Sequence, residues 1–400
     1  MSSSGIERRK CNHLLRVAWT AHRGAGAGTA EKAEELMRQL LPGNTFTMTD
    51  SHPDIILFMS GGSERKAIEL ADPGRPVLLL SIRGNNAYAA ATEVMAWMVN
   101  NGRLAMLSDA GDAAESGLID RWCRVAGACD GLQGRRAGLI GTVSEWLVAS
   151  DVSAKALLQR FGVELAGMPW NELPDFSLEE PDAALMNRLR DHNPEGLEDA
   201  ARVLTLLRRV ISDKSLDAIG VECFSLVQER KVTACMALAQ LNAEGTVAAC
   251  EGDLVSMAGM MAGKALTGSV PWMANTTRLT SKTLILSHCT APFDMISQVK
   301  LPTHYETGWS LAVDGDITAR DITVYRFSEN LDRVFIAEGR VVGRPHLEDA
   351  CRTQVEIELP EEALHVLRER PLGNHLLLSP GKHAELLRLA CWYRGIEPVK

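Results

Sequence analysis

Two carboxylates stand at a turn between a predicted strand and a predicted helix. The strand is the apolar run 246–250, and a helix rich in Met, Ala and Leu begins at Leu254. Glu251 and Asp253 lie between them, on either side of Gly252. Because open α/β sheets bind ligands at the carboxyl ends of their strands, the pair could transfer a proton or hold a metal. An Asp directly before a helix is also a favoured N-cap that needs no ligand, and on pattern alone the cap is the commoner role.

Histidines and a further glutamate extend this chemistry. A predicted strand at 283–289 delivers His288 at its end, His375 follows Gly373, and Glu229 lies in a short charged run. Carboxylates and imidazoles suit Mn²⁺, Mg²⁺, Fe²⁺ or Co²⁺ better than a thiolate zinc site would. Such an ion polarises a carbonyl while a neighbouring carboxylate moves a proton. Each residue also has an ordinary alternative, a hydrogen-bonded surface histidine or a solvated glutamate, and spacing alone does not make them neighbours.

Length and charge limit the class of protein. A chain of 400 residues predicts two or three domains. The net charge of −9 argues against nucleic acid or an anionic membrane as a partner. No apolar run approaches the roughly 20 residues of a membrane span, and the N-terminus lacks a signal-peptide core, so we expect a cytoplasmic protein. The nine cysteines are odd in number and contain no CxxC pair, which argues against a disulfide framework and a zinc ribbon.

Strands and helices alternate over the first half of the chain, which predicts parallel sheets built from β-α units. Strands are expected at 13–20, 54–58, 76–81, 136–141 and 163–167, and helices at 31–41, 64–71, 85–99, 153–161 and 194–212. The glycine-rich run 24–28 follows the first strand, but it lacks both the GxGxxG order and a Gly-Lys-Ser/Thr end. A flexible turn is therefore favoured there over a phosphate-binding loop.

The texture changes in the second half. A strand is expected at 218–227 and a helix at 234–241, and the carboxylate turn follows them. From Leu311 onward the pattern is typical of antiparallel strands; these are expected at 322–327, 333–337 and 353–359, before a last helix at 382–394. The predicted fold is α/β, with two doubly wound parallel-sheet domains, 1–115 and 116–215, followed by a C-terminal α+β domain with antiparallel strands, 216–400.

Several short motifs resemble the L-fucose isomerase-like family, within the fucose/arabinose isomerase superfamily, and the chain is similar to a divergent member. Three of them follow one another in the order of the family's C-terminal half: CEGD at 250–253, LTG at 266–268 and WMAN at 272–275. The others are GLIGTVSEWLVAS at 138–150, LSHC at 286–289, and GNH at 373–375 followed by Gly381. Together they cover the chain from about residue 13 to its end.

The resemblance implies aldose–ketose isomerisation of a sugar through a cis-enediol, with a divalent metal, Mn²⁺ foremost. By motif it assigns Asp253 and His375 to the metal. Glu229 lies 24 residues before Asp253, the distance that the resemblance calls for, and is expected to be the second ligand and the base, with Glu251 as its rival. The expected substrate-binding residues are His288, Asn374 and Arg352. The resemblance also implies a homo-oligomer.

Two departures from the family pattern keep a second function open. Asn275 replaces an Asp, and Thr290 replaces a Gly. The alternative to a ketol isomerase is a non-catalytic sugar-binding or regulatory relative with a degenerate metal site. The joint presence of Glu251, Asp253 and His375 favours the enzyme. Three thiols lie in these motifs and are expected to cluster without forming a disulfide: Cys250, Cys289 and Cys351.

Overall fold

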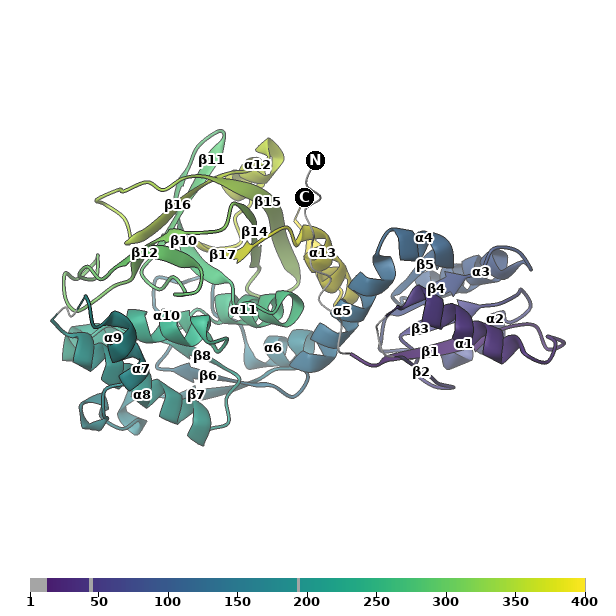
Figure 1. Cartoon of the computed structure of the whole chain (residues 1–400), viewed down its shortest axis with the longest axis horizontal. Helices are drawn as coiled ribbons and strands as arrows, with labels where there is room; N and C mark the ends of the chain where they lie inside the picture. Colours follow the sequence, from purple (N-terminus) through teal and green to yellow (C-terminus); the bar gives the residue numbers. More distant parts are fainter. Residues whose placement is uncertain (1–12, 43–45, 193–194, 400) are drawn as a thin grey trace. The chain divides into compact units, whose positions relative to one another are not determined.

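A computed structural model describes residues 13–42, 46–192 and 195–399 (Figure 1). The chain forms two compact units, Met1–Asp130 (unit 1) and Gly131–Lys400 (unit 2). The boundary expected at 115 falls inside unit 1, and that expected at 215 falls inside unit 2. Among the described residues, no helix combines the length and the hydropathy that crossing a membrane requires.

Unit 1 is built on a five-stranded parallel sheet in the order β2-β1-β3-β4-β5. Its strands are β1 (Leu15–Thr20), β2 (Phe46–Met48), β3 (Ile55–Phe58), β4 (Val77–Ser81) and β5 (Ala105–Asp109), and its helices are α1 (Thr29–Leu40), α2 (Glu64–Leu70), α3 (Ala87–Asn100), α4 (Ala110–Glu115) and α5 (Leu118–Leu132). The apolar runs of β3 and β4 are buried at every position, as parallel strands covered on both faces require.

Unit 2 begins with a four-stranded parallel sheet in the order β7-β6-β8-β9. Its strands are β6 (Arg136–Ile140), β7 (Glu164–Met168), β8 (Ala218–Val221) and β9 (Val247–Cys250), with helices α6 (Ala154–Phe161), α7 (Ala183–Leu189), α8 (Leu197–Asp213), α9 (Cys223–Arg230), α10 (Cys235–Ala243) and α11 (Leu254–Thr267), and 3-10 turns η1 (Trp170–Glu172) and η2 (Phe176–Leu178). Because β8 and β9 extend the sheet begun by β6 and β7, the predicted second and third domains share one sheet.

The strand predicted at 218–227 is shorter than expected. It ends at Val221, and the carboxylate of Glu222 accepts a hydrogen bond from the amide of Ser225 at 3.0 Å. This is an N-cap, and it starts helix α9 at Cys223.

Seven strands form a predominantly antiparallel sheet in unit 2, in the order β14-β17-β10-β11-β16-β15-β18. They are β10 (Trp272–Leu279), β11 (Thr283–His288), β14 (Asp321–Phe327), β15 (Arg333–Gly343), β16 (Thr353–Glu358), β17 (His375–Pro380) and β18 (Glu397–Pro398), accompanied by the β12 (Ile296–Lys300) and β13 (Asp314–Ile317) pair and by helices α12 (Glu361–Glu369) and α13 (Ala384–Tyr393). β14 also pairs with β15, so six of these strands close into a barrel. The expected combination of parallel α/β sheets and a C-terminal antiparallel sheet is confirmed.

Helix α11 joins the parallel sheet to the barrel. Two small residues let it approach closely: a Cβ on Gly259 would lie 2.4 Å from Leu377 Cδ1 of β17, and one on Gly263 would lie 2.1 Å from the Tyr325 hydroxyl of β14. That hydroxyl donates a hydrogen bond to the carbonyl of Gly259 at 2.9 Å. The amino end of α11, with its preceding carboxylates, is therefore held against the start of β17.

Candidate metal site

The turn between β9 and α11 has an unusual backbone. Glu251 has φ of 57° and Gly252 has φ of 64°, so both are left-handed. A Cβ on Gly252 would lie 2.3 Å from the carbonyl oxygen of Thr142, so only glycine fits there. A left-handed glutamate costs about 1–3 kcal/mol and persists only where its surroundings enforce it. The amide of Ser144 helps by donating to the carbonyl of Glu251 at 3.1 Å.

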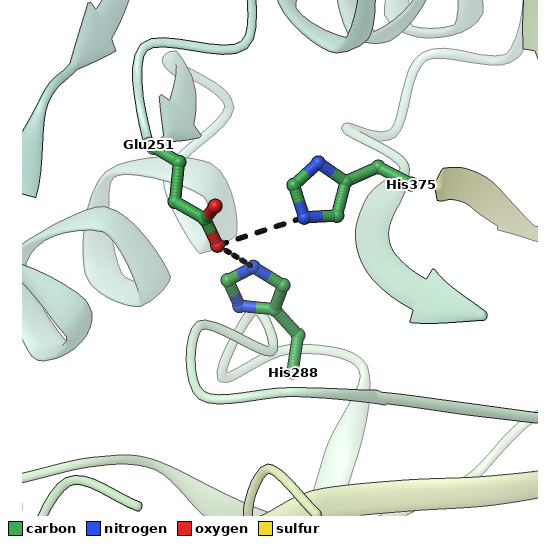
Figure 2. Close-up of side chains that lie close together, drawn as sticks. All are labelled: Glu251, His288 and His375. Atoms are coloured by element: carbon green, nitrogen blue, oxygen red, sulfur yellow. Dashed lines mark ion pairs between the residues drawn. The ribbon is translucent and has the colours of Figure 1, made fainter. Parts of the chain in front are cut away.

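This turn directs Glu251 toward two histidines of the barrel. Oε1 of Glu251 lies 3.6 Å from Nε2 of His288 and 3.6 Å from Nε2 of His375. Figure 2 shows the three side chains pointing toward one another, from the end of β11, the start of β17 and the β9–α11 turn. The residues are 8%, 3% and 0% exposed. One candidate ligand atom from each lies within 4.8 Å of the others, so this buried cluster could hold a metal ion.

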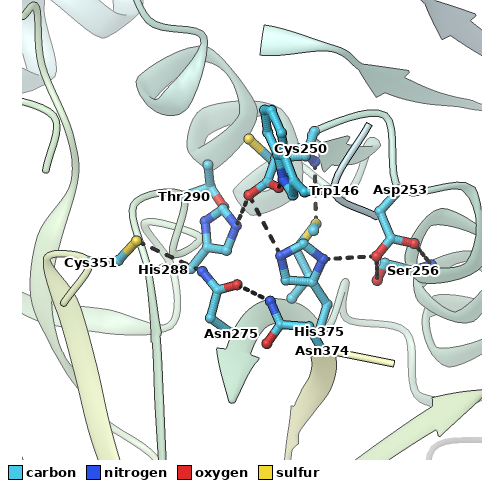
Figure 3. A network of polar contacts seen from close by, with 12 residues as sticks. Trp146, Cys250, Asp253, Ser256, Asn275, His288, Thr290, Cys351, Asn374 and His375 are labelled. Carbon is cyan, nitrogen blue, oxygen red and sulfur yellow. Dashed lines mark hydrogen bonds and ion pairs between the residues drawn. The ribbon is translucent and has the colours of Figure 1, made fainter. Parts of the chain in front are cut away.

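Asp253 lies behind His375 instead of in the cluster. Its Oδ2 is 2.8 Å from Nδ1 of His375, and its Oδ1 accepts the amide of Ser256 at 2.6 Å (Figure 3). Asp253 is thus the N-cap of α11, one of the two roles considered from the sequence, and it is also the partner of a buried histidine, but it is not part of the cluster that could hold a metal. Because Nδ1 of His375 faces a carboxylate, it carries the proton, and Nε2 is left to face Glu251.

A buried arginine that the sequence analysis missed completes this arrangement. Nη1 of Arg326, on β14, lies 3.0 Å from Oδ2 of Asp253 and 2.8 Å from Oγ of Ser256. Nη2 donates to Ser150 Oγ at 2.7 Å and to the carbonyl of Ala149 at 3.2 Å. Arg326 is 1% exposed. In the sequence, Arg326 could have been recognised as the single charged residue inside the predicted antiparallel strand 322–327.

The charges shift the proton affinities of the cluster. Burial alone would raise the pKa of Glu251, but the neighbouring His288 and His375 lower it well below its usual range. Burial would likewise raise the pKa of Asp253, but Arg326 and His375 lower it well below its usual range. Burial would lower the pKa of His375, but the hydrogen bond to Asp253 and the contact with Glu251 raise it to about 9. Both carboxylates are therefore ionised at neutral pH, and in the metal-free protein the imidazole of His375 is in its charged, doubly protonated form.

An exposed tryptophan covers the other oxygen of Glu251. The indole N–H of Trp146 donates to Oε2 at 2.6 Å, while 53% of Trp146 is exposed. Its ring packs edge-on against Phe224 at a centroid distance of 4.7 Å, and Phe224 packs against His304 at 5.8 Å. Trp146 belongs to the motif 138–150 that carried part of the resemblance, but its contact with Glu251 was not foreseen.

The donor set of this cluster fits a divalent cation, and the two histidines fit it unequally. Nε2 of each is buried and has no hydrogen-bond partner among the described residues. Metal–ligand bonds of about 2.0–2.2 Å place ligand atoms roughly 3–3.5 Å apart, close to the spacing here. His375 donates through Nδ1 to Asp253, the usual support of a metal-bound histidine. His288 instead accepts the amide of Cys289 at Nδ1 at 2.9 Å, so its neutral ring carries a proton on Nε2.

Besides Asp253, three of the residues predicted from sequence lie outside the cluster. Glu229 is exposed in the last turn of α9. Nε of Arg352 donates to the carbonyl of Thr303 at 2.9 Å. Asn374 is exposed, and its Nδ2 donates to Oδ1 of Asn275 at 2.5 Å (Figure 3). The predicted metal set of Glu229, Asp253 and His375 therefore differs from the cluster that the structure forms, which consists of Glu251, His288 and His375.

The three thiols expected to cluster are all buried and free. Cys289 and Cys351 pack together with Cys235. Cys250 contacts a different partner, Cys223, with 3.3 Å between the sulfur atoms. The expectation of thiols without a disulfide is confirmed for these residues, but the direct contacts pair Cys250 with a residue that was not anticipated.

No protein-family model matches the chain, and no curated protein is similar to it at a significant level. The fold and the cluster are therefore the observations from which a function has to be argued.

Proposed function

We propose that the chain is a metal-dependent ketol isomerase that acts on a sugar or modified sugar through a cis-enediol. The observation that carries the proposal is the buried Glu251–His288–His375 cluster, with two imidazole nitrogens that face Glu251 and have no hydrogen-bond partner among the described residues. A divalent cation, Mn²⁺ foremost, would supply polarisation of the substrate's carbonyl and hydroxyl oxygens when bound. The doubly wound arrangement of both parallel sheets, expected from the alternation of strands and helices, belongs to the same proposal.

The side chains have separate tasks in this proposal. Glu251 and His375 hold the cation, and Asp253 fixes the ring of His375 so that Nε2 faces it. Glu251 also moves the proton between the two substrate carbons, because it is the carboxylate of the cluster and is ionised at neutral pH. Glu229 loses this role, because it is exposed at the end of α9. His288 directs its Nε2 proton toward Glu251 or a substrate oxygen.

Metal analysis of the purified protein, followed by an aldose/ketose panel with Mn²⁺, tests the proposal. Wild type should bind about one Mn²⁺ per chain and interconvert at least one pair. His375→Gln should weaken Mn²⁺ binding at least tenfold, about the cost of disturbing a metal site. His288→Gln should weaken it less, because Nδ1 of His288 already accepts an amide proton.

His365→Gln on the exposed face of α12 is the matched control and should bind Mn²⁺ like wild type. Glu251→Gln should abolish turnover, and Glu229→Gln should leave it unchanged. Equal Mn²⁺ affinity in His375→Gln and His365→Gln would refute the site. Loss of turnover in Glu229→Gln alone would return the base to Glu229.

The enclosure of the cluster favours a second candidate, a sugar-binding relative without turnover. Glu251, His288 and His375 are almost fully buried, so a substrate reaches the cluster only if neighbouring side chains move, and Trp146, which is half exposed and bonded to Glu251, is the candidate gate. Trp146→Ala separates the two functions. Faster turnover in this variant supports an enzyme gated by Trp146, whereas sugar binding without turnover in both proteins supports the binding relative.

A further inference from the structure

A pocket of about 920 Å³ lies in unit 1, and none of the residues of the metal cluster lines it. Three loops line it, and each follows a strand of the parallel sheet. The loop after β1 contributes His22 and Gly26, the loop after β3 contributes Ser60 and Gly61, and the loop after β4 contributes Asn85 and Asn86. The glycine-rich run 24–28, interpreted from sequence as a flexible turn, is thus part of the wall of a pocket.

The position of the pocket in the sheet is significant. The chain passes from β1 to β2 on one side and then to β3 on the other, so the strand order reverses between β1 and β3. In open parallel sheets, ligands bind at the carboxyl ends of the strands at this reversal, because the loops there diverge and leave a crevice. The volume also lies within the roughly 300–1,000 Å³ range of small-molecule sites.

Two long helices begin at this pocket without a side-chain cap. The N-cap residues are Gly28 for α1 and Asn86 for α3, and neither provides a capping hydrogen bond. Both have positive φ, 90° and 56°, and Asn86 lines the pocket. The amides at the start of a helix carry partial positive charge and attract an anion. Lys32, in the first turn of α1, adds a full positive charge to the lining.

Two buried hydroxyls at the carboxyl ends of β1 and β4 also have no hydrogen-bond partner among the described residues. Thr20, the last residue of β1, and Ser81, the last residue of β4, are both fully buried, and neither hydroxyl has a partner among the described residues. The register places both beside Phe58, so they lie in one row on one face of the sheet. The residues that follow them, Ala21 and Ile82, line the pocket. A buried hydroxyl without a partner is uncommon. Thr20 and Ser81 are not themselves among the residues that line the pocket; they directly precede two that do.

We propose that this pocket binds a small phosphomonoester that carries hydroxyl groups, of the size of a pentose phosphate. The phosphate lies at the starts of α1 and α3, beside Lys32. Glu64, Glu93 and Asn85 face the pocket and offer acceptors to the hydroxyls. No Phe, Tyr or Trp is among the described residues that line it, so the large aromatic surfaces that stack with a flavin are not provided. The two carboxylates also disfavour a polyphosphate.

Titration calorimetry of the full chain tests the proposal with three probes: ribose 5-phosphate, ribose and inorganic phosphate. The phosphate ester should bind, inorganic phosphate should bind more weakly, and ribose should show no binding at the same concentration. Ala89, an exposed residue of α3, lines the pocket, and Ala89→Glu adds a negative charge and bulk there. This variant should weaken ribose 5-phosphate binding at least tenfold.

Ala96→Glu is the matched control, because Ala96 is exposed on the same helix, two turns further on and outside the lining. It should bind ribose 5-phosphate like wild type. Equal affinities in Ala89→Glu and Ala96→Glu, or no binding of the ester by wild type, would overturn the proposal. Binding that is lost in His375→Gln but kept in Ala89→Glu would place the ester at the metal cluster and would also overturn it. The proposed isomerase can fail without affecting any of these outcomes.

Discussion

The helices that begin at the carboxyl ends of the two parallel sheets are capped differently. In unit 2, carboxylates occupy this edge: Glu222 caps α9 and Asp253 caps α11, each with a side-chain hydrogen bond. In unit 1, Asp109 at the end of β5 caps α4 in the same way, but Gly28 and Asn86 stand before α1 and α3 and provide no cap. This edge is therefore satisfied by side chains before α9 and α11 in unit 2, whereas in unit 1 the starts of α1 and α3 are left at an open pocket.

This contrast has an energetic basis. The occupied edge contains a charged network that is closed to water, in which Asp253 faces both Arg326 and His375. Buried charges of this kind are costly unless they are paired, so each member depends on the others. The open edge leaves its helix amides to solvent or to a ligand and carries no such dependence. Substitutions should consequently affect folding at the first edge and ligand affinity at the second.

The largest effect is expected for Asp253→Asn. Asn is also a good N-cap, so the variant keeps the cap and removes only the charge between Arg326 and His375. Breaking a buried ion pair costs about 3–5 kcal/mol, and we expect a loss of this size in the free energy of unfolding, measured by urea denaturation.

Glu358→Gln is the control for this change, because it breaks an exposed ion pair with Arg340 in the same unit. Exposed pairs contribute at most about 1 kcal/mol. If the two variants lose the same stability, the buried network does not hold the edge together.

An intermediate effect is expected from pH in the metal-free protein. The pKa of His375 is raised to about 9, so its contribution to stability is complete below its ordinary pKa of about 6.5 and is lost as the pH rises through about 9. The free energy of unfolding should therefore fall by a few kcal/mol between these values.

The same network predicts the acid side of the profile. The lowered pKa values of Glu251 and Asp253 give stability that is present above about pH 4 and is lost on further acidification. The free energy of unfolding, measured across pH in wild type and in His375→Gln, tests the predicted loss of stability between about pH 6.5 and 9. If His375→Gln loses as much stability over this range as wild type does, a group other than His375 causes the loss.

The smallest effect on stability is expected for Asn86→Asp at the open edge. Asp tolerates a left-handed backbone, as Asn does, and its charge interacts favourably with the start of α3 by about 0.3–1 kcal/mol. The unfolding free energy should stay within about 1 kcal/mol of wild type. The affinity for ribose 5-phosphate should nevertheless fall several-fold, because the new carboxylate occupies the place of the phosphate.

Asn101→Asp places the same charge at the other end of α3, where Asn101 is the C-cap. It should leave ribose 5-phosphate binding unchanged. Comparable losses of affinity in Asn86→Asp and Asn101→Asp would show that net charge, and not the edge of the sheet, controls binding.

Much of the fold could be predicted because it is encoded locally. Apolar runs bounded by glycine or polar residues gave the strands ending at Phe58 and Ser81, and helical spacing gave the helices that follow them. The limits appear where contacts are distant in sequence. The four strands β6 to β9 form one sheet although the texture of the sequence suggested a boundary at 215, because strand pairing does not follow composition.

The site shows the same division. Glu251 and Asp253 could be found from the turn that they share, and His375 and His288 from motifs. Glu229 was selected by its distance along the chain, but Glu222 starts α9 early enough to put Glu229 in the exposed last turn. Arg326 reaches Asp253 across 73 residues through the pairing of β14 with β17, and no local pattern reports such a contact.

Closure of the barrel has a consequence for the order of events during synthesis. Strand β17 pairs with β10, about a hundred residues earlier, and with β14, and it brings His375 with it. Until residues 375–380 leave the ribosome, β10 and β14 lack the strand that pairs with both of them. Asp253 and Glu251 also lack the imidazole of His375, which contacts both carboxylates. The nascent unit 2 therefore exposes two unpaired strand edges late in translation, a state prone to aggregation. Unit 1, whose strands pair with segments that are closer in sequence, is complete before this point and can fold earlier.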